Sequence, residues 1–237
     1  MSVRVVVRTF SELCITVGTV IVLFVVYVLF WTGVKADTAM DDQIEQLRNQ
    51  WARNSATAEP GGSTATESPG AAPAPAKPAA YEDGRPFAVM YIPRLGLTWN
   101  KPVLEGTRTK TLKKGLGHYA STARLGERGN FAVAGHRRTY GDPFKDFPRL
   151  RPGDPVVLTD GTSWFTYRID TKPYRTLPSD TAVIDPVPRK SGYTRAGRYL
   201  TLTTCDPEWG HSHRLIVWAH LDETQPVEAG KPEALRR

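Results

Sequence analysis

Cysteine is almost absent from this chain of 237 residues, which contains only Cys14 and Cys205. Cys14 lies in an uncharged apolar run and is interpreted as an apolar filler of that run. If the run crosses a membrane, Cys205 has no disulfide partner on its own side. A leftover cysteine in an exported domain indicates either intermolecular pairing or a free reactive thiol, and a buried inert thiol is the alternative.

Metal ligands at a useful spacing are also lacking. Cys205, His211 and His213 follow a Cys-x5-His-x-His pattern, which is not a recognised zinc spacing and has no obvious fourth ligand. We therefore expect no metal site and no cofactor.

No helical segment concentrates the positive charge of the chain in a stripe. The formal net charge is +7, and residues 81–237 hold 25 Lys and Arg against 17 Asp and Glu. The basic residues are scattered along this region, which argues against a nucleic-acid partner. The positive field favours anionic surroundings instead, such as lipid headgroups or an acidic polymer.

Charge is missing altogether from Leu13 to Trp31, a run rich in Val, Ile, Leu and Phe. Its length meets the roughly 20 residues that a membrane-spanning helix needs, so residues 13–33 are predicted to be a transmembrane anchor. Arg4 and Arg8 precede the run, and the positive-inside rule then places residues 1–12 in the cytoplasm and the rest outside the cell membrane. A cleaved signal peptide is the alternative, but its apolar region is only about 7–15 residues long.

Larger apolar residues are lacking between residues 54 and 80, a segment with five prolines, three glycines and nine alanines. Such a segment cannot bury a core and is predicted to be a disordered tether, which completes an extracellular region at 34–80.

A short helix is predicted before this tether, from Asp37 to Arg53, with Asp41 and Asp42 in its first turn. We expect its apolar face to pack on the membrane surface or on the following domain. The spacings of four, three and four residues that define this face belong to Met40, Ile44, Leu47 and Trp51.

From residue 81 onward the apolar runs become short or alternating, and Gly, Pro and Asp separate them. This pattern is typical of an all-β sandwich or barrel. Short helical turns are expected at 112–122 and 143–150. Eight strands are predicted, near residues 87–92, 98–104, 130–135, 155–158, 164–171, 174–177, 200–205 and 214–220.

Three side chains are candidates for chemistry. Cys205 ends a predicted strand just before a turn, and its nucleophilic use requires a nearby base or cation to favour the thiolate. His136 closes another predicted strand, and pairing a histidine with a cysteine is a recurring way to activate a thiol. Arg214 begins the strand after Cys205, and its fixed, always charged fork suits an oxyanion.

Each candidate also has a simpler interpretation: a buried cysteine, a surface histidine or a solvated arginine at a strand edge. The domain as a whole also has a simpler interpretation: it is a non-catalytic module that binds the cell wall through Trp164, Trp209 and Trp218. Tryptophans on strands are more often core residues, so the aromatics alone carry little weight.

Taken together, the motifs resemble the sortases, the cysteine transpeptidases of Gram-positive cell surfaces. Thr201-Leu-Thr-Thr-Cys205 matches the family signature Thr-Leu-x-Thr-Cys, Arg214 follows in the next strand, and Val133-Ala-Gly-His136 matches the histidine strand. The stretches 91–97 and 102–106 are similar to the opening strands of the family. The resemblance implies an eight-stranded sortase β-barrel over residues 81–224, followed by a tail at 225–237.

Two stretches are most similar to the class E sortases of actinobacteria: Gly117-His118-Tyr119 and residues 134–144. That class is associated with a Leu-Ala-x-Thr-Gly sorting signal in place of Leu-Pro-x-Thr-Gly. We expect the Tyr119 hydroxyl to bind a backbone amide that proline lacks, and His118 to line the same groove.

The resemblance also implies a two-step acyl transfer. Cys205 attacks the Thr–Gly carbonyl of the signal, Arg214 stabilises the oxyanion with help from the Thr204 hydroxyl or nearby backbone, and His136 acts first as acid and then as base. The implied partners are surface proteins with a sorting signal, an amine of a peptidoglycan precursor, and the membrane through the N-terminal helix.

Overall fold

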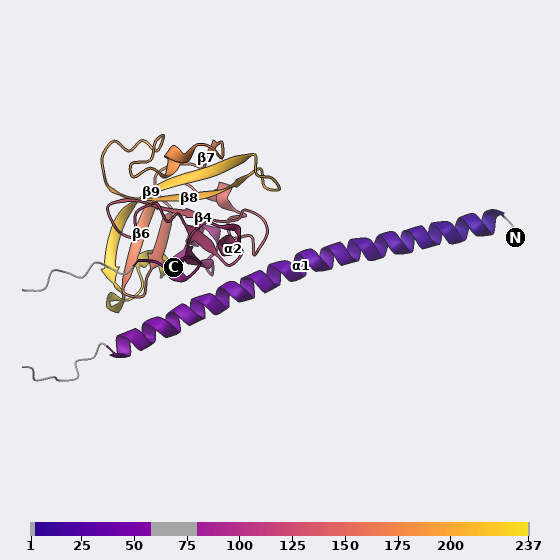
Figure 1. The fold of residues 1–237 in the computed structure, drawn as a ribbon, viewed down its shortest axis with the longest axis horizontal. Helices are drawn as coiled ribbons and strands as arrows, with labels where there is room; N and C mark the ends of the chain where they lie inside the picture. The colour runs from indigo at the N-terminus through magenta and orange to yellow at the C-terminus, as the bar shows by residue number, and fades with distance from the viewer. Residues whose placement is uncertain (1–2, 58–79, 237) are drawn as a thin grey trace, which may run out of the picture.

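The computed structural model describes residues 3–57 and 80–236, which form one long helix and a β-barrel. The helix α1 runs without interruption over Val3–Thr57. In Figure 1 its C-terminal half lies along the barrel while the N-terminal half projects far beyond it. The predicted tether falls almost entirely on residues outside the described ranges.

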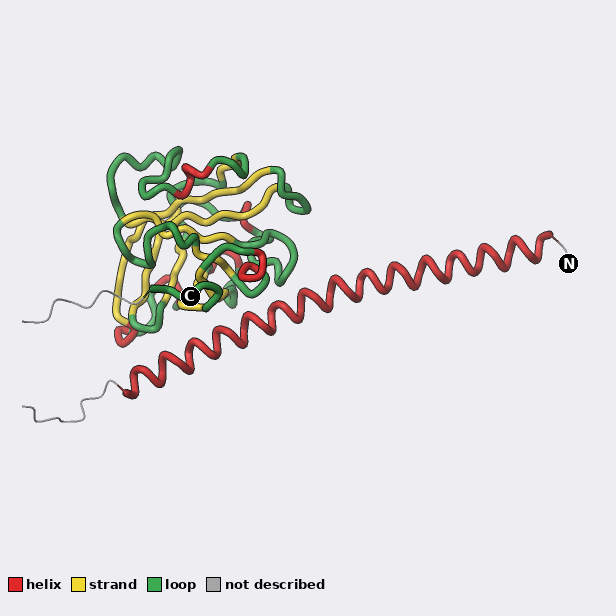
Figure 2. Tube along the Cα trace, viewed as in Figure 1, coloured by secondary structure: helices red, strands yellow, loops and turns green. Residues whose placement is uncertain are grey.

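The barrel contains eight hydrogen-bonded strands in the order β6-β5-β1-β2-β3-β4-β8-β9, and a β6–β9 pairing closes it within the described residues. A ninth strand, β7, pairs only with β9 and lies outside the closed ring. In Figure 2 the barrel strands are yellow, and the red helix α1 runs beneath the barrel. The strands are β1 Pro86–Tyr91, β2 Asn100–Glu105, β3 Leu116–His118, β4 Gly129–Ala134, β5 Pro155–Thr159, β6 Ser163–Ile169, β7 Tyr174–Thr176, β8 Arg198–Asp206 and β9 His213–Pro226.

The short helical elements lie in the connections between strands. One of them, η2, confirms the helical turn predicted near 143–150. They are η1 Pro93–Leu95, α2 Thr109–Leu112, η2 Phe147–Arg149, η3 Thr181–Ile184, η4 Val227–Ala229 and η5 Glu233–Leu235.

The expected eight-stranded barrel is confirmed, but the identity of one strand is corrected. The stretch 112–122 was expected to be a helical turn, whereas Leu116–His118 forms β3, parallel to β2 and antiparallel to β4. Three residues are too few to show the alternation that predicts a strand, and their partners are distant in sequence. The predicted strand near 174–177 exists as β7 but does not belong to the closed ring.

The separate helix predicted over 37–53 is also corrected, because it continues the apolar N-terminal helix. Asp41 and Asp42 therefore lie in mid-helix and not in a first turn. The only breaker between the two predicted segments is Gly33, and one glycine costs a helix about 1 kcal/mol, too little to end it. The predicted apolar face is confirmed, and it packs on the barrel.

The N-terminal half of α1 has the composition of a membrane helix. Residues Arg4–Tyr27 form a candidate span with a mean hydropathy of 2.2, and none of that window is buried. By length and composition this segment is consistent with a single-pass anchor.

The barrel interior is filled by inward-facing apolar side chains, which fix the strands that carry the site. The largest fully buried ones include Phe131 on β4 and Tyr167 on β6. Parallel pairing of β4 with β8 and antiparallel pairing of β8 with β9 then bring three strand ends together at one end of the barrel.

Candidate active site

The strand pairing brings the three predicted chemical residues to one end of the barrel. Parallel β4 and β8 are in register at Ala134 and Thr203, and the Gly135 amide donates to the Thr203 carbonyl at 3.0 Å. The residues that follow, His136 and Cys205, therefore emerge from the same end. Arg214 on antiparallel β9 is the direct cross-strand partner of Cys205.

His136 and Cys205 line one hollow of about 200 Å³. The rest of its wall comes from the segment after His136 and from the loop between β8 and β9. Arg214 lines a second hollow of about 100 Å³, together with Tyr119 and Thr203. Cys205 on β8 and Arg214 on β9 are cross-strand neighbours, and each lines one of the two hollows. This arrangement suits a peptide that crosses from one hollow to the other.

His136 is held in a state suited to proton transfer. Its Nε2 atom is buried and has no hydrogen-bond partner among the described residues. Burial lowers the pKa of the imidazole below its ordinary value, and the positive charge of Lys113 lowers it further. The ring also tilts against Tyr140, with centroids 5.3 Å apart. The neutral imidazole is therefore favoured, and within the described residues the hydrogen-bonding capacity of Nε2 is unused.

Arg214 is partly held by the loop that precedes it. Its Nη1 atom donates to the carbonyls of His211 and His213, at 3.0 and 2.9 Å. Within the described part of the chain, no other nitrogen of this guanidinium makes a hydrogen bond. The backbone thus orients the fork while Nε and Nη2 are left for a substrate oxygen.

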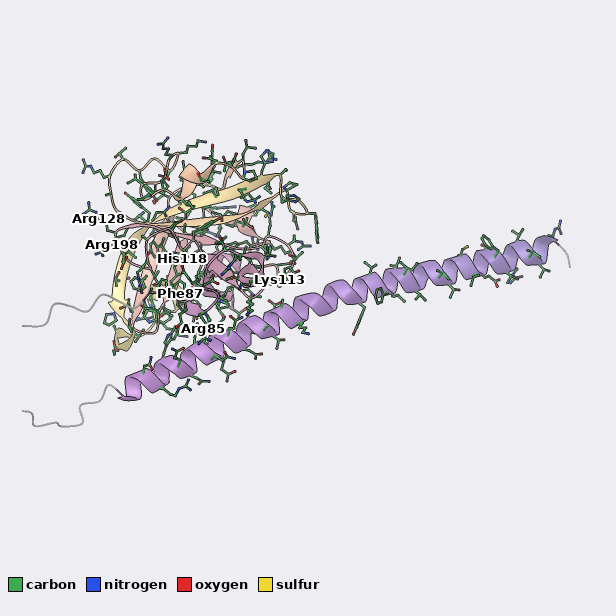
Figure 3. The ribbon with its side chains drawn as sticks, in the orientation of Figure 1. Arg85, Phe87, Lys113, His118, Arg128 and Arg198 are labelled. Atoms are coloured by element: carbon green, nitrogen blue, oxygen red, sulfur yellow. The ribbon has the colours of Figure 1, made fainter. Side chains whose placement is uncertain are left out.

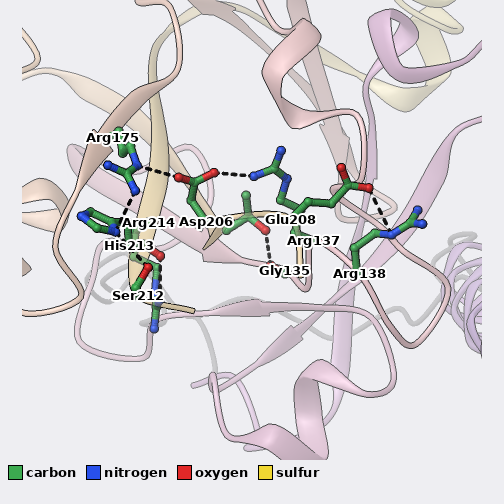
Figure 4. Close-up of polar contacts among 10 residues, drawn as sticks. Gly135, Arg137, Arg138, Arg175, Asp206, Glu208, Ser212, His213 and Arg214 are labelled. Atoms are coloured by element: carbon green, nitrogen blue, oxygen red, sulfur yellow. Dashed lines mark hydrogen bonds and ion pairs between the residues drawn. The ribbon is translucent and has the colours of Figure 1, made fainter. Parts of the chain in front are cut away.

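A carboxylate next to Cys205 joins the strand ends. Asp206 accepts hydrogen bonds from Arg137 at 2.5 Å and from Arg175 at 2.6 Å, and Arg175 also donates to His213 Nδ1 at 2.9 Å (Figure 4). Burial alone would raise the pKa of the Asp206 carboxyl, but the two arginines outweigh it and hold that pKa below its ordinary value. Asp206 is therefore a carboxylate that links β8 to the segment after His136 and to β7.

The outer rim of the hollow contains a second group of charges. The guanidinium of Arg138 lies 4.3 Å from the ring centre of Trp209 and pairs with Asp142 at 3.1 Å and Glu208 at 3.2 Å. Trp209 is 72% exposed. It is thus a rim residue, whereas Trp218 is a core residue.

Of the candidates beyond these three, the structure brings Tyr119 to the site. Its hydroxyl lies 3.1 Å from Thr203 Oγ1, and both residues line the hollow that contains Arg214. The Thr204 hydroxyl is buried and donates to the Gly135 carbonyl at 2.9 Å. Thr204 therefore holds the backbone just before His136, and its hydroxyl proton is engaged there.

His118 is not brought to the groove. It is 2% exposed, its ring stacks on Phe131 at 4.7 Å, and Figure 3 shows it next to Phe87 within the barrel. Its Nδ1 lies 2.6 Å from Glu105 Oε2, and its Nε2 lies 3.1 Å from the Ala123 carbonyl. The expectation that His118 lines the groove is wrong, because its side chain faces the core at the end of β3, whereas Tyr119 follows the strand and lines the hollow that contains Arg214.

Among the described residues, no group of three His, Cys, Asp or Glu side chains could hold a metal ion. His213 instead accepts a hydrogen bond from Arg175. The site therefore consists of a thiol, an imidazole and guanidinium groups.

Sequence reasoning missed Asp206, Arg137 and Arg175. The sequence held a signal for two of them, because Asp206 directly follows Cys205 and Arg137 directly follows His136. Nothing local marks Arg175, which reaches Asp206 only because β7 pairs with β9.

The comparison with protein families identifies the chain. The model of the sortase domain matches residues 90–222, and the chain belongs to the sortase family, a family of transpeptidases. It is close to the class E sortases of Streptomyces.

Three relatives illustrate this closeness. Sortase SrtE1 of Streptomyces coelicolor is 36% identical over 96% of this chain, which spans only 60% of that protein's length. Sortase E from Streptomyces avermitilis is 81% identical, covers 66% of this chain and 100% of the solved one, and gives a TM-score of 0.63. Sortase E1 from Streptomyces coelicolor, solved with a tripeptide in its active site, is 41% identical over 64% of this chain and 97% of that one, with a TM-score of 0.61.

Proposed function

We propose that this chain is a membrane-anchored sortase. It cleaves a C-terminal sorting signal between Thr and Gly through a thioacyl intermediate on Cys205 and transfers the protein to an amine of a peptidoglycan precursor. The observation that carries this proposal is the shared hollow of His136 and Cys205, with Arg214 directly across the ladder from the thiol. The tripeptide in the active site of the related sortase E1 supports a peptide as the substrate class.

The first step forms a thioester. The Cys205 thiolate attacks the Thr carbonyl carbon, and the two free nitrogens of Arg214 donate to the oxygen as it becomes negative. The C–N bond to glycine then breaks as protonated His136 gives its proton to the leaving amine. Because burial disfavours the imidazolium, only a minor fraction of the protein holds the thiolate and the imidazolium together, and a modest rate follows.

The second step reverses these roles. An acceptor amine attacks the thioester carbonyl, neutral His136 takes the proton that the amine loses, and the C–S bond breaks to restore the thiolate. The lowered pKa of His136 agrees with this role, because the neutral ring is present at neutral pH.

Tyr119 is proposed to select the second residue of the signal. If its hydroxyl donates to Thr203 Oγ1, a lone pair remains to accept from the backbone amide of an incoming peptide. Alanine has that N–H and proline does not. This supports a Leu-Ala-x-Thr-Gly signal over Leu-Pro-x-Thr-Gly.

Mass spectrometry of the full chain in detergent tests the proposal. The protein is incubated with Leu-Ala-x-Thr-Gly and Leu-Pro-x-Thr-Gly peptides plus a glycine amine. We expect an acyl adduct on Cys205, none on Cys14, and a product joined to the amine. Cys205→Ala should lose both signals while keeping the fold by circular dichroism, and retained cleavage would falsify the nucleophile assignment.

A non-catalytic wall-binding domain is the competing function. Trp209 is its best remaining support, because it is the exposed member of the three tryptophans first considered, while Trp164 and Trp218 are buried. In that case purified peptidoglycan would bind the chain, Trp209→Ala would weaken binding, and no peptide would be cleaved.

A further inference from the structure

The apolar face of α1 covers an outer surface of the barrel. Met40, Ile44 and Leu47 are each at most 3% exposed, and the last two pack with Val89 of β1. Three large side chains of a helix reach such burial only when a partner surface covers them. The barrel thus supplies a docking surface for the membrane-distal half of α1.

Polar contacts fix the register of this docking. Lys101 Nζ on β2 donates to Asp37 Oδ1 at 2.9 Å, and Lys101 is only 14% exposed. Gln43 Nε2 donates to the Lys114 carbonyl at 3.0 Å. A helix that slid or rotated on the barrel would break both contacts.

Two glycines allow the helix to lie close to barrel loops. A Cβ at Gly141 would come within 2.4 Å of the Met40 side chain, and one at Gly161 within 2.2 Å of the Trp51 ring. The two contacts lie eleven residues apart on α1, or roughly 16 Å along its axis. Contacts this far apart resist tilting as well as sliding.

The N-terminal part of α1 makes no such contacts, since none of the candidate span Arg4–Tyr27 is buried. At a rise of 1.5 Å per residue, the docked turns begin roughly 15 Å beyond Tyr27, at Asp37, and end roughly 36 Å beyond it, at Trp51. Because one uninterrupted helix contains both halves, the barrel cannot move relative to the bilayer independently of the span.

We propose that α1 is a rigid support that holds the Cys205 hollow at a fixed height above the bilayer. The surface fits this chain's own helix, and the height selects substrates that are anchored in the same membrane. This rests on the proposed function, because it concerns where a sorting signal can reach Cys205. The segment 58–79 then connects the docked helix to the barrel and does not set the reach of the enzyme.

The test measures the shortest spacer that still permits cleavage in proteoliposomes. The substrate is a Leu-Ala-x-Thr-Gly peptide joined to a transmembrane segment by spacers of increasing length. Seven helix-forming residues inserted between Lys35 and Ala36 preserve the helix face and raise the barrel by roughly 10 Å. We expect the shortest cleaved spacer to grow by about three residues, at roughly 3.4 Å per extended residue.

The matched control inserts the same seven residues between Gly61 and Gly62. A docked barrel predicts no change in the shortest spacer, and cleavage of a soluble peptide should be unchanged in both variants. An unchanged spacer after the helix insertion, or an equal change after the control insertion, overturns the proposal.

A cross-link separates failure of docking from failure of the proposed function. In a Cys14→Ser and Cys205→Ser background, Asp37→Cys and Lys101→Cys should be joined by a short bismaleimide in the membrane-embedded full chain. Asp42→Cys with Lys101→Cys is the control, because Asp42 points about 140° away around the helix. If no peptide is cleaved but the first pair cross-links, the function is wrong and the docking stands; if neither pair cross-links, the docking is wrong.

A second inference comes from the charges beside Cys205. Asp206 and Arg137 directly follow Cys205 and His136, and their side chains are only 16% and 10% exposed. Arg175 occupies the other oxygen of the same carboxylate. We infer that Asp206 is a positioning residue that sets the separation of Cys205 and His136, again on the basis of the proposed function.

Asp206→Asn tests this role. We expect kcat to fall on the order of tenfold to a hundredfold while KM changes little, because misplaced groups react slowly. Alkylation of Cys205 by iodoacetamide at pH 7 should be at least as fast as before, since removal of a neighbouring negative charge favours the thiolate. Unchanged kcat, or alkylation that falls in parallel with kcat, overturns the inference.

The matched control is Asp154→Asn, which removes another buried carboxylate that pairs with an arginine, Arg94, away from both hollows. It should leave kcat unchanged. The NMR signals of the His136 ring should shift in Asp206→Asn and not in Asp154→Asn, which remains decisive if the unsubstituted chain does not turn over the peptide.

Discussion

The surroundings of His136 and His118 differ although both histidines belong to motifs of the same family, His118 at the end of β3 and His136 two residues after the end of β4. His118 has partners at both ring nitrogens, and Thr122 Oγ1 cannot donate to it because it donates to the Tyr119 carbonyl at 2.7 Å. The His118 Nε2 must therefore donate to the Ala123 carbonyl, and Nδ1 is occupied by Glu105 Oε2. His136 instead has a buried Nε2 that finds no partner in the described part of the chain. A fully satisfied histidine stabilises a fold, whereas an unsatisfied one beside a thiol is available for chemistry.

Replacing His136 should have the largest effect on activity. In His136→Ala we expect kcat/KM for the signal peptide to fall about a thousandfold, because general acid and base catalysis are both lost. The melting temperature should hardly change, since no hydrogen bond to Nε2 is removed. Peptide turnover and calorimetry on the same sample check this, and a large loss of stability with little loss of activity would reverse the assigned roles of the two histidines.

Arg214→Lys should be next, with a loss of about a hundredfold in kcat. Lysine keeps the charge but cannot donate to the two loop carbonyls and to an oxyanion in the same fixed geometry. Steady-state kinetics with the signal peptide measure this. A loss confined to KM would assign Arg214 to binding alone.

Glu105→Gln should affect stability more than chemistry. It removes the carboxylate that bonds the buried His118 Nδ1, and we expect a loss of about 1–3 kcal/mol in the free energy of unfolding. Chemical denaturation measures this loss, and kcat well below the melting temperature should stay near that of the unsubstituted chain. A selective loss of kcat would show that the His118 region takes part in the reaction.

Lys113→Gln should raise the pKa of His136, because a neighbouring positive charge is removed, while Lys114→Gln serves as control. NMR titration of the His136 ring in both variants measures this pKa.

The lowered folded-state pKa also determines how stability depends on pH. Because the unfolded chain binds the proton more readily, the contribution of His136 to stability is present above the unfolded pKa of about 6.5 and is lost as the pH falls below it. Lys113→Gln should make this acid loss smaller, and an unchanged titration in both variants would contradict the assigned cause.

The smallest effect is expected from Tyr119→Phe. Loss of one hydrogen bond of about 1 kcal/mol should reduce the preference for alanine over proline in the signal by roughly fivefold. Competition between Leu-Ala-x-Thr-Gly and Leu-Pro-x-Thr-Gly peptides measures the ratio directly. An unchanged ratio would show that Tyr119 does not read that amide.

Sequence by itself determined the features that depend on local pattern. The long run without charge predicted the apolar helix, and the helical spacing of Met40, Ile44 and Leu47 predicted its buried face. Short apolar runs separated by Gly, Pro and Asp predicted the barrel. The family motif pointed to Cys205, His136 and Arg214 as candidate site residues. Composition and periodicity are properties of neighbouring residues, so they can be interpreted without the fold.

Tertiary structure alone decided how distant segments combine. It turned Leu116–His118 into a strand, because both of its partners are remote in sequence, and it separated buried His118 from adjacent Tyr119 at the groove. It placed Arg175 on Asp206 through the pairing of β7 with β9. It also decided that the apolar face of α1 docks on the barrel, since a helical pattern shows that a face will be buried but not which surface covers it.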